Sequence, residues 1–487
     1  MPRQPAPPTV APSLDDHFVA SASLSIGGPI GRHARLTRST TAALAVVLIV
    51  AAITLVLGFA EKQKCLTDDG WVHQHQYTHM CYSDIYPLFS TEGLNEGKVP
   101  YRDHPVEYPV LTGGVMWLAG DAARATAPDD AGRRFYLLHV PILGMFALVL
   151  VATTFRLAGR RAWDAVMVAA SPVVAVYAFY NWDLLAAGFL GAAMEAWRRR
   201  RPALAGVLLG MGASAKLYPA FLLVALLPLC LRAGRMRAWL AASAAGTAAW
   251  VAINAPVALA YRENWSHFYK FSSQRSAGWH DDSIWYQINR LTENSTAGIG
   301  KTLHDLVIPP LAEGESPSAL NSLTLVLLIV VWSAILLLAW RAPRRPRVAQ
   351  VAFLIVVAFL FANKVWSPQY ALWYVPLGVL ALPRWRTFVV WQLSELLVFA
   401  TVMLSIITLV DPAAGLDHRW FFVAVWLRNF VLFYMAGAII RHMWRPDLDP
   451  VRRTGDDDPA GGVLDGAPDR AEALPGVAAR EPAYGAA

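Results

Sequence analysis

Several polar motifs interrupt a chain that is otherwise apolar, and their residue types are those that group-transfer chemistry uses. An early loop carries Asp84, whose carboxylate could act as a general base on an acceptor hydroxyl. Lys216 and Lys364 stand at the ends of apolar segments, where an ammonium group could neutralise a phosphate at the level of the lipid headgroups. These residues suggest transfer of a group from a lipid-linked anionic donor, because a phosphate already leaves readily without a general acid.

Other polar and aromatic residues accompany these groups and could bind the substrates. Carboxylates and amides hydrogen-bond to hydroxyl groups, and aromatic rings can stack on sugar faces. His280 belongs to this set because it lies beside acidic and aromatic residues in a later polar loop. The remaining candidates for substrate binding are Tyr86, Arg102, Asp103, Glu107, Tyr108, Asn181, Asp183, Asn363, Gln369 and Tyr370.

Each candidate also has a purely structural explanation. Asp84 could cap the N-terminus of a helix, and Asp183 could stabilise one through the helix dipole. Asp103 could simply pair with Arg102 at the surface. Lys216 could extend its ammonium group to the membrane interface without binding a substrate. The residue types alone leave both explanations open.

The composition is that of a membrane protein. Of the 487 residues, 56% are hydrophobic and only 16% are charged, whereas about a quarter of the residues in a soluble domain are charged. Apolar windows of the length that a spanning helix needs recur from Thr41 to Arg441. The net charge of +7 arises from arginine clusters between these windows, which is typical of orientation signals. We therefore expect neither a soluble cytosolic enzyme nor a nucleic-acid-binding protein.

The arginine clusters predict the topology, because basic residues favour the cytoplasmic side of a membrane. Placing all of them inside gives an all-α polytopic membrane protein with about 12 spans and both termini in the cytoplasm. The stretch from Pro109 to Ala127 is then an amphipathic helix on the outer membrane face, since a span there would place Arg198–Arg201 outside. The expected spans are 41–60, 135–158, 164–180, 183–197, 203–216, 219–232, 238–256, 319–340, 348–362, 370–382, 387–410 and 419–441.

These spans divide the chain into a central membrane domain and two polar ends. Residues 1–40 and 442–487 are rich in Pro, Ala and small residues, and we expect both to be disordered and cytoplasmic. Residues 41–441 form the transmembrane catalytic domain, with large extracytoplasmic loops at 61–134 and 261–318.

Three cysteines and one pair of charged residues need separate explanations. Cys65 and Cys81 share the first outer loop and could form a disulfide there, which the sequence does not decide. Cys230 lies in an apolar segment and is expected to be a small packing residue. Glu395 and Arg428 lie inside spans at similar depth, so we expect them to form a structural ion pair.

Taken in order along the chain, the polar motifs resemble those of glycosyltransferase family 87. The resemblance runs from about Thr41 to Arg441, and the shared order of the motifs makes the set more specific than any one of them. The motifs that carry it are the Asp84 loop, Tyr101-Arg102-Asp103, Glu107-Tyr108-Pro109, Asn181-Trp182-Asp183, Lys216-Leu217-Tyr218-Pro219, and Asn363-Lys364 to Gln369-Tyr370.

This resemblance implies a GT-C-like fold in which jaw helices of the first outer loop cover the active site. Family 87 belongs to the GT-C superfamily of membrane transferases and includes actinobacterial mannosyl- and arabinofuranosyltransferases that use polyprenyl-phosphate sugars. GT-C enzymes carry their catalytic carboxylate in the first outer loop, which corresponds to Asp84 here. Inverting transfer from a β-linked mannosyl phosphate would yield an α-mannoside.

We therefore expect a plasma-membrane glycosyltransferase that moves one sugar, with mannose favoured, from a polyprenyl-phosphate donor to an extracytoplasmic glycan or glycolipid. Its partners would be this donor, the acceptor and the bilayer, and no cofactor is expected. His73, His75 and His79 have a spacing that could ligate a metal, but a lipid monophosphate needs less charge neutralisation than a pyrophosphate, so we expect none. The alternatives are an arabinofuranosyltransferase, a transporter or flippase for a lipid-linked sugar, and an inactive subunit of an envelope-assembly complex.

Overall fold

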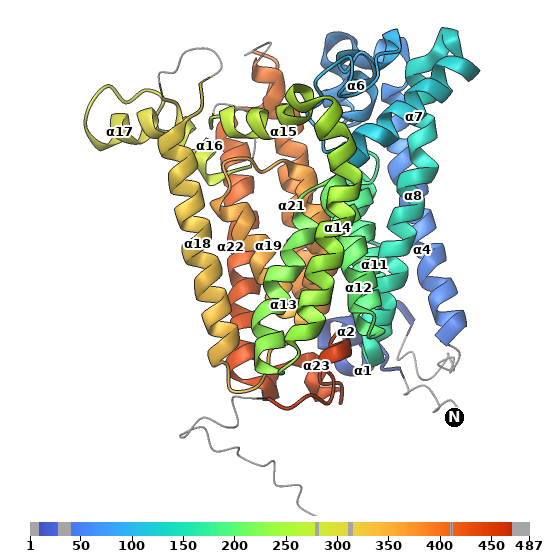
Figure 1. Cartoon of the computed structure of the whole chain (residues 1–487), viewed down its shortest axis with the longest axis vertical. Helices are drawn as coiled ribbons and strands as arrows, with labels where there is room; N and C mark the ends of the chain where they lie inside the picture. The colour runs from blue at the N-terminus through green and yellow to red at the C-terminus, as the bar shows by residue number, and fades with distance from the viewer. Residues whose placement is uncertain are drawn as a thin grey trace, which may run out of the picture.

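The structure is a computed structural model that describes residues 9–27, 40–277, 282–309, 315–409, 411 and 413–469. Within these residues the regular structure is helical, and the β structure is limited to an isolated bridge between Pro100 and His104. The helices form an upright bundle whose two ends carry different short elements (Figure 1). We name these ends after the topology that the sequence predicts, so that the outer end is the one that bears α6 and the inner end is the opposite one. The outer end holds α5 (His75–Thr78), α6 (Ile85–Thr91), α7 (Val110–Thr126), α15 (Arg262–Gln274), α16 (Ile284–Thr292) and α17 (Gly298–Val307). The inner end holds α1 (Pro12–Asp15), α2 (His17–Gly27) and α23 (Pro450–Arg453).

Six helices in the described part of the chain are long and apolar enough to cross a membrane. Their length exceeds the roughly 20 residues that a bilayer requires, and few charged residues interrupt them. The prediction of an all-helical membrane protein is therefore confirmed. These helices are α4 (Thr40–Lys62), α8 (Ala131–Leu157), α14 (Met236–Ala260), α18 (Ser318–Arg341), α21 (Trp385–Ile406) and α22 (His418–Trp444).

Shorter helices fill the centre of the bundle where the sequence predicts further spans. All residues of the apolar helix α20 are buried, as expected for a helix that is hydrophobic on every side. Because these helices are shorter than a typical span, the count of twelve stays a prediction. They are α9 (Ala165–Ala169), α10 (Pro172–Tyr177), α11 (Asp183–Arg198), α12 (Pro202–Ala215), α13 (Phe221–Arg232), α19 (Val348–Ala362) and α20 (Ala371–Ala381).

The segment expected to span at 164–180 is divided into two short helices. Pro172 begins α10 and cannot continue the hydrogen-bond ladder of α9. Ser171 is the N-cap of α10, and its side-chain oxygen accepts a hydrogen bond from the Val174 amide at 3.2 Å. The chain therefore turns at this point instead of crossing as one straight helix.

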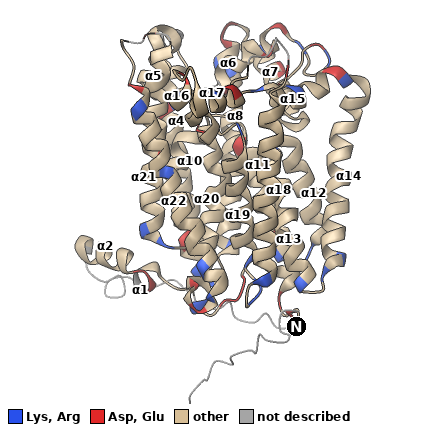
Figure 2. Ribbon diagram, turned by 90° about the vertical axis from the view of Figure 1, so that its left-hand side faces the viewer, with Lys and Arg blue, Asp and Glu red and all other residues tan. Residues whose placement is uncertain are grey.

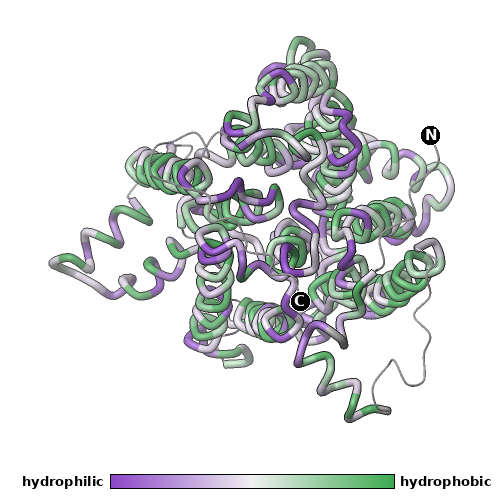
Figure 3. Tube along the Cα trace, turned by 90° about the horizontal axis from the view of Figure 1, so that it is seen from below, coloured by the Kyte–Doolittle hydropathy of each residue, from purple (hydrophilic) through white to green (hydrophobic). Residues whose placement is uncertain are grey.

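Glycines bring α12 and α14 into close contact. A Cβ atom on Gly206 would lie 2.0 Å from the Ala242 carbonyl oxygen, and one on Gly210 would lie 2.2 Å from that of Gly246. Any larger residue would force the two helices apart, so these glycines fix the packing. The view along the bundle shows mainly hydrophobic residues on the helices (Figure 3), as the composition predicts.

Most charged residues lie at the two ends of the bundle, with Lys and Arg prominent at the inner end (Figure 2). The inner arginines include Arg161, Arg232 and Arg347, which are all buried. Buried charges require partners, and these arginines obtain them from the two polar ends of the chain.

The prediction that the polar ends are disordered is wrong for residues 12–27 and 446–469. Arg347 pairs with Asp449 at 2.7 Å, and Arg232 pairs with Asp469 at 2.6 Å. Arg161 similarly pairs with Asp15 of α1. Individual carboxylates thus bind buried arginines, a pairing that average composition does not reveal.

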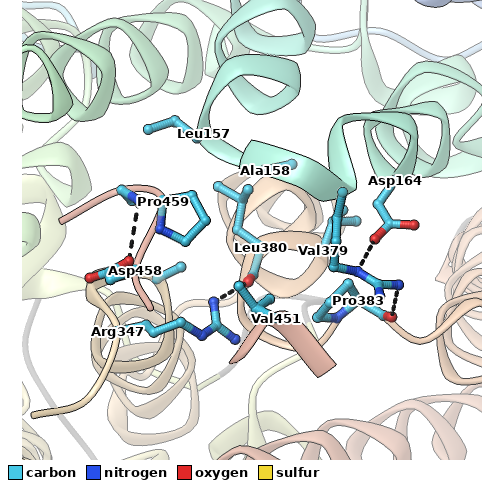
Figure 4. Close-up of a pocket in the computed structure, with 13 residues that line it drawn as sticks. Leu157, Ala158, Asp164, Arg347, Val379, Leu380, Pro383, Val451, Asp458 and Pro459 are labelled. Atoms are coloured by element: carbon cyan, nitrogen blue, oxygen red, sulfur yellow. Dashed lines mark hydrogen bonds and ion pairs between the residues drawn. The ribbon is translucent and has the colours of Figure 1, made fainter. Parts of the chain in front are cut away.

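The C-terminal segment also packs against the inner ends of α8 and α11. Val451 and Pro459 line a small pocket together with Leu157 and Ala158 at the end of α8 (Figure 4). The indole nitrogen of Trp197 donates a hydrogen bond to the Gly461 carbonyl at 2.9 Å. This pocket lies at the inner end, whereas the candidate functional residues described below lie at the outer end.

Candidate active site

Asp84 lies directly before α6, yet its side chain does not cap that helix. Its carboxylate instead accepts two hydrogen bonds from other side chains. The Tyr82 hydroxyl donates to Oδ1 at 2.9 Å, and the Asn181 amide donates to Oδ2 at 2.7 Å. The helix-cap explanation for Asp84 is therefore excluded, and the carboxylate is held in a fixed orientation.

The backbone of the Asp84 loop is anchored to the bundle. The Asp84 amide donates to the Tyr180 carbonyl at 2.8 Å, and the Ser83 hydroxyl donates to the Phe179 carbonyl at 2.9 Å. Cys65 and Cys81 form a disulfide, which answers the question that the sequence leaves open. These contacts position Asp84 before any substrate arrives, which is what a preorganised catalytic group needs.

Asn181 connects Asp84 to the second polar motif of the first outer loop. Its amide nitrogen also lies 2.9 Å from the Tyr108 hydroxyl, and its amide oxygen accepts from the Trp182 backbone. The structure thus brings together Asp84, Tyr108 and Asn181, three residues that the sequence proposes for the site.

A second cluster lies next to Asp84 and is built on Asp183, the first residue of α11. The Lys216 ammonium donates to both carboxylate oxygens of Asp183, at 2.8 and 2.9 Å, and the Trp373 indole donates to Oδ1 at 2.6 Å. The same ammonium lies 4.9 Å from the centre of the Tyr370 ring, which stacks on Trp373. Lys216 is therefore a partner of Asp183 and at the same time a cation close to Asp84.

Asp84 keeps partial solvent exposure although protein atoms surround it. Burial raises the pKa of its carboxyl group, while the hydrogen bonds from Asn181 and Tyr82 and the charge of Lys216 lower it. The net effect is a raised pKa. A carboxylate with this balance is a better proton acceptor than a solvated aspartate.

Tyr82→Phe is expected to move the acidic limb of the pH profile of kcat/KM to higher pH. The change removes one hydrogen bond that stabilises the Asp84 carboxylate, so the pKa of Asp84 rises further and less of the ionised base remains at low pH. Measuring transfer rates across pH would test this. Tyr77→Phe is the control, since Tyr77 stacks on Tyr82 without a described hydrogen bond to Asp84, and its profile should match the wild type. An unmoved limb in Tyr82→Phe would contradict the assignment.

Lys364 lies apart from the Asp84 cluster, on the segment that follows α19. Its ammonium donates to the Ser273 carbonyl at 2.8 Å and to the Asn321 side chain. Burial and the nearby positive charge of Arg275 lower the pKa of Lys364 to about 8. Lys364 and Arg275 are two positive charges close to each other in a partly buried environment, and this arrangement favours the binding of an anion.

Glu107 lies between these two regions. Protein atoms surround its side chain although it remains exposed, and this partial burial raises the pKa of its carboxyl group. The charge of Arg275 opposes this shift, and the charge of Asp84 adds to it. Glu107 therefore interacts electrostatically with both Asp84 and the Arg275 charge near Lys364.

Other proposed residues do not join the Asp84 cluster. Arg102 and Asp103 form an exposed pair at 2.8 Å, and Asp103 also accepts from the Val99 amide. The Arg102 guanidinium lowers the pKa of Asp103 to about 2, as the surface-pair explanation predicts. Tyr86 stacks on Trp71 with ring centres 5.7 Å apart.

The other residues of the motif from Asn363 to Tyr370 have different surroundings. The Asn363 side chain donates to the Val365 carbonyl at 2.6 Å, which shapes its own turn. Gln369 is buried, and its amide oxygen has no hydrogen-bond partner within the described structure. His280 lies outside the described residues. In the part of the chain that is described, no group of three or more His, Cys, Asp and Glu side chains could hold a metal ion.

The structure adds residues that sequence reasoning missed. Lys62, at the end of α4, is buried and donates to the Tyr82 carbonyl at 3.0 Å, so it holds the loop from below. Its position directly after a long apolar run, where a lysine would normally reach solvent, was a possible signal. Tyr82 stands two residues before Asp84, and Trp373 lies inside an apolar helix where nothing marks it as polar.

A buried charge network supports the site from inside the bundle. Nη1 of Arg428 lies 3.6 Å from a Glu395 carboxylate oxygen, so the expected ion pair is confirmed. Asp282 of the second outer loop joins at 3.1 Å, which the sequence did not predict. The Arg428 guanidinium also lies 4.0 Å from the centre of the Trp366 ring, in the same segment as Lys364.

Comparison with models of known protein families places the chain beside one of them. The model of glycosyltransferase family 87 matches residues 130–368, a range that includes Asn181, Asp183, Lys216 and Lys364. A search of the curated proteins found no match. The matched range excludes Asp84, so the assignment of that residue depends on the geometry described above.

Proposed function

We infer from the match to glycosyltransferase family 87 that the chain is a membrane glycosyltransferase of this family. On this premise we propose that it transfers a single mannose from a polyprenyl phosphate to a cell-envelope glycan or glycolipid. The observation that carries the proposal is the Asp84 carboxylate, held by two side-chain donors at the outer end of an apolar bundle. We place this end on the extracytoplasmic face of the plasma membrane, because basic residues gather at the opposite end.

In the proposed reaction, Asp84 accepts the proton of an acceptor hydroxyl while the hydroxyl oxygen attacks the anomeric carbon of the donor sugar. A bond forms between that oxygen and the anomeric carbon. The bond from the anomeric carbon to the phosphate oxygen breaks, and polyprenyl phosphate leaves with the electron pair. Attack opposite the leaving group inverts the configuration, so a β-linked mannosyl phosphate gives an α-mannoside.

The surrounding residues fit binding of a sugar and an acceptor. Asn181 and Tyr108 provide hydrogen-bonding groups beside the base, and Glu107 provides a further acceptor. The Tyr370 ring, stacked on Trp373, offers an aromatic surface for a sugar. We propose that α7 lies at the interface as a jaw helix that covers the Asp84 cluster when the substrates are bound.

The donor phosphate is proposed to bind at Lys364, with Lys216 close to the reacting carbon. Burial and the charge of Arg275 disfavour the ammonium form of Lys364, and a phosphate would relieve that repulsion. Lys216 is already paired with Asp183, so it contributes less free charge. We propose a reaction without a metal ion, since the donor phosphodiester carries a single negative charge that these side chains can neutralise.

Lys364→Ala is expected to raise the KM for the donor by about 10- to 100-fold, because a charge-assisted hydrogen bond contributes about 1.5–3 kcal/mol. Donor affinity of the wild type should also fall above pH 8, where Lys364 loses its charge, and the variant should lack this dependence. Steady-state transfer at varied donor concentration and pH measures both effects. Lys301→Ala serves as the control because Lys301 pairs with Asp305 on exposed α17. An unchanged donor KM in Lys364→Ala would count against the phosphate role.

The reaction class is tested with purified protein in lipid vesicles, radiolabelled polyprenyl-phosphate-mannose and a glycolipid extract as acceptor. Label that enters a new glycolipid supports the mannosyltransferase. If label enters a glycolipid only when the arabinofuranosyl donor is supplied, the transferred sugar is arabinofuranose instead of mannose. Movement of intact donor across the vesicle membrane, without transfer from either donor, overturns the proposal in favour of a transporter.

A further inference from the structure

A groove lined by arginines lies at the inner end, far from the proposed reaction. It is formed by the turn between α11 and α12, the start of α14 and the C-terminal segment near residue 463. The side chains that define it are Arg200, Arg235, Arg237, Met236, Val463 and Asp465, which line an open hollow of about 580 Å³.

The three arginines of this groove are exposed and have no ion-pair partner among the described residues. Neighbouring arginines behave differently. Arg198 and Arg199 both bind Glu195 at 2.6 Å. Asp465 lies near Arg200 and compensates for one charge, so three positive charges against one negative charge leave a net charge of +2. The groove therefore presents unneutralised guanidinium groups that could accept an anion.

The same groove borders the surface that faces the lipid chains. Leu240 on α14 is 56% exposed, and Leu204 on α12 is 44% exposed. Leu240 follows Met236 by four residues, or about 6 Å along the helix axis. Figure 2 shows Lys and Arg at the inner end of α14. The arginines at the inner end match the anionic headgroup of a phospholipid, and the exposed leucines farther along the helices match its acyl chains.

We propose that this groove binds an anionic phospholipid of the inner leaflet, with its phosphate at Arg200, Arg235 and Arg237 and its acyl chains along α12 and α14. The proposal depends on the bundle lying in a bilayer with its inner end at the inner leaflet. It does not depend on the identity of the transferred sugar. A planar guanidinium group can hydrogen-bond to two phosphate oxygens at once, which favours arginine over lysine for this role. A soluble phosphate would not need the adjacent leucines.

The test compares full-length wild type with the triple variant R200Q/R235Q/R237Q in detergent, by native mass spectrometry with added phosphatidylglycerol or phosphatidylcholine. The matched control is R341Q/R386Q/R441Q, which removes the same charge from exposed inner-end arginines outside the groove. We expect wild type and control to bind phosphatidylglycerol in preference to phosphatidylcholine. The groove variant should bind phosphatidylglycerol at least about tenfold more weakly.

Asp465→Asn provides a change in the opposite direction. It removes the carboxylate from the groove, so phosphatidylglycerol should bind more tightly, a result that damage to the fold would not produce. Equal weakening in the groove variant and the control would overturn the site, because it would indicate only a diffuse attraction to basic residues. Equal binding of both lipids, or displacement of phosphatidylglycerol by millimolar inorganic phosphate, would also overturn it. Sugar transfer is measured separately, so failure of this site and failure of the proposed function are distinguishable.

Discussion

Asp84→Asn is expected to lower the rate of sugar transfer by about 10²- to 10⁴-fold, the range that general-base catalysis supplies. Asparagine has the shape of aspartate, and its amide oxygen can still accept the hydrogen bond from Asn181. The Tyr82 hydroxyl can turn and accept from the new amide nitrogen, since a hydroxyl is both donor and acceptor. The substitution therefore removes the basicity while the loop geometry is retained.

The measurement is transfer of radiolabelled mannose by purified wild type and variant at saturating donor, together with the donor KM. We expect kcat to fall while the donor KM changes little, because Asp84 acts on the acceptor proton and Lys364 binds the phosphate. Asp121→Asn is the control, as Asp121 is an exposed partner of Arg124 on α7, and its rate should equal that of the wild type. Near-normal turnover by Asp84→Asn would remove the base assignment.

The sequence predicts the positions of the long helices well because their signal is local. A run of apolar residues ended by arginines is visible in one stretch of chain, so the expected span 135–158 corresponds to α8 at Ala131–Leu157. The fate of short helices is less predictable. The interval 164–180 is apolar apart from Asp164 and Ser171, yet Pro172 divides it.

The site is only partly predictable because its contacts join residues that are distant in the sequence. Asp84 and Asn181 are 97 residues apart, and only the convergence of helix ends makes their side chains meet. Residue type alone also did not separate Asp103, which pairs with Arg102 at the surface, from Asp183, which is buried with Lys216. The missed role of Lys62 has the same origin, since its partner is a backbone carbonyl that no sequence pattern marks.

The C-terminal segment shows how composition can mislead. Residues 446–469 contain the prolines, glycines and acidic residues that are typical of disorder, yet they fold against the inner end. The deciding contacts are single pairs such as Arg347 with Asp449, in which both side chains are buried. The averaged charge of the segment contains no information about such a pair.

Arg428→Met is expected to destabilise the protein by about 3–5 kcal/mol, the cost of leaving buried charges without their partner. Arg428, Asp282 and Glu395 are all completely buried, and the arginine is the shared cation of both carboxylates. The Tyr374 hydroxyl and the Trp391 indole also donate to Glu395, at 2.6 and 2.9 Å, but neither supplies a positive charge. Methionine fills a similar volume, so the loss of charge, more than a cavity, would determine the effect.

Equilibrium unfolding in mixed detergent micelles with increasing sodium dodecyl sulfate measures this loss. Arg441→Gln is the control on the same helix, because Arg441 is exposed, and it should unfold like the wild type. Adding Glu395→Gln to Arg428→Met should restore part of the stability, since it removes one of the two carboxylates left without the cation. If Arg428→Met unfolds at the same sodium dodecyl sulfate concentration as the control, the network contributes nothing to stability.

The same variant connects the interior of the bundle to the site. The Asp282 amide donates to the Trp366 carbonyl at 2.8 Å, and Trp366 lies two residues after Lys364 on the segment proposed to bind the donor phosphate. Arg428 contacts both Asp282 and the Trp366 ring, so it holds the second outer loop and the Lys364 segment in one arrangement. Where Arg428→Met remains folded, its donor KM should therefore rise while the pH profile set by Asp84 stays unchanged. A shifted acidic limb with an unchanged donor KM would instead indicate that the network acts on the base.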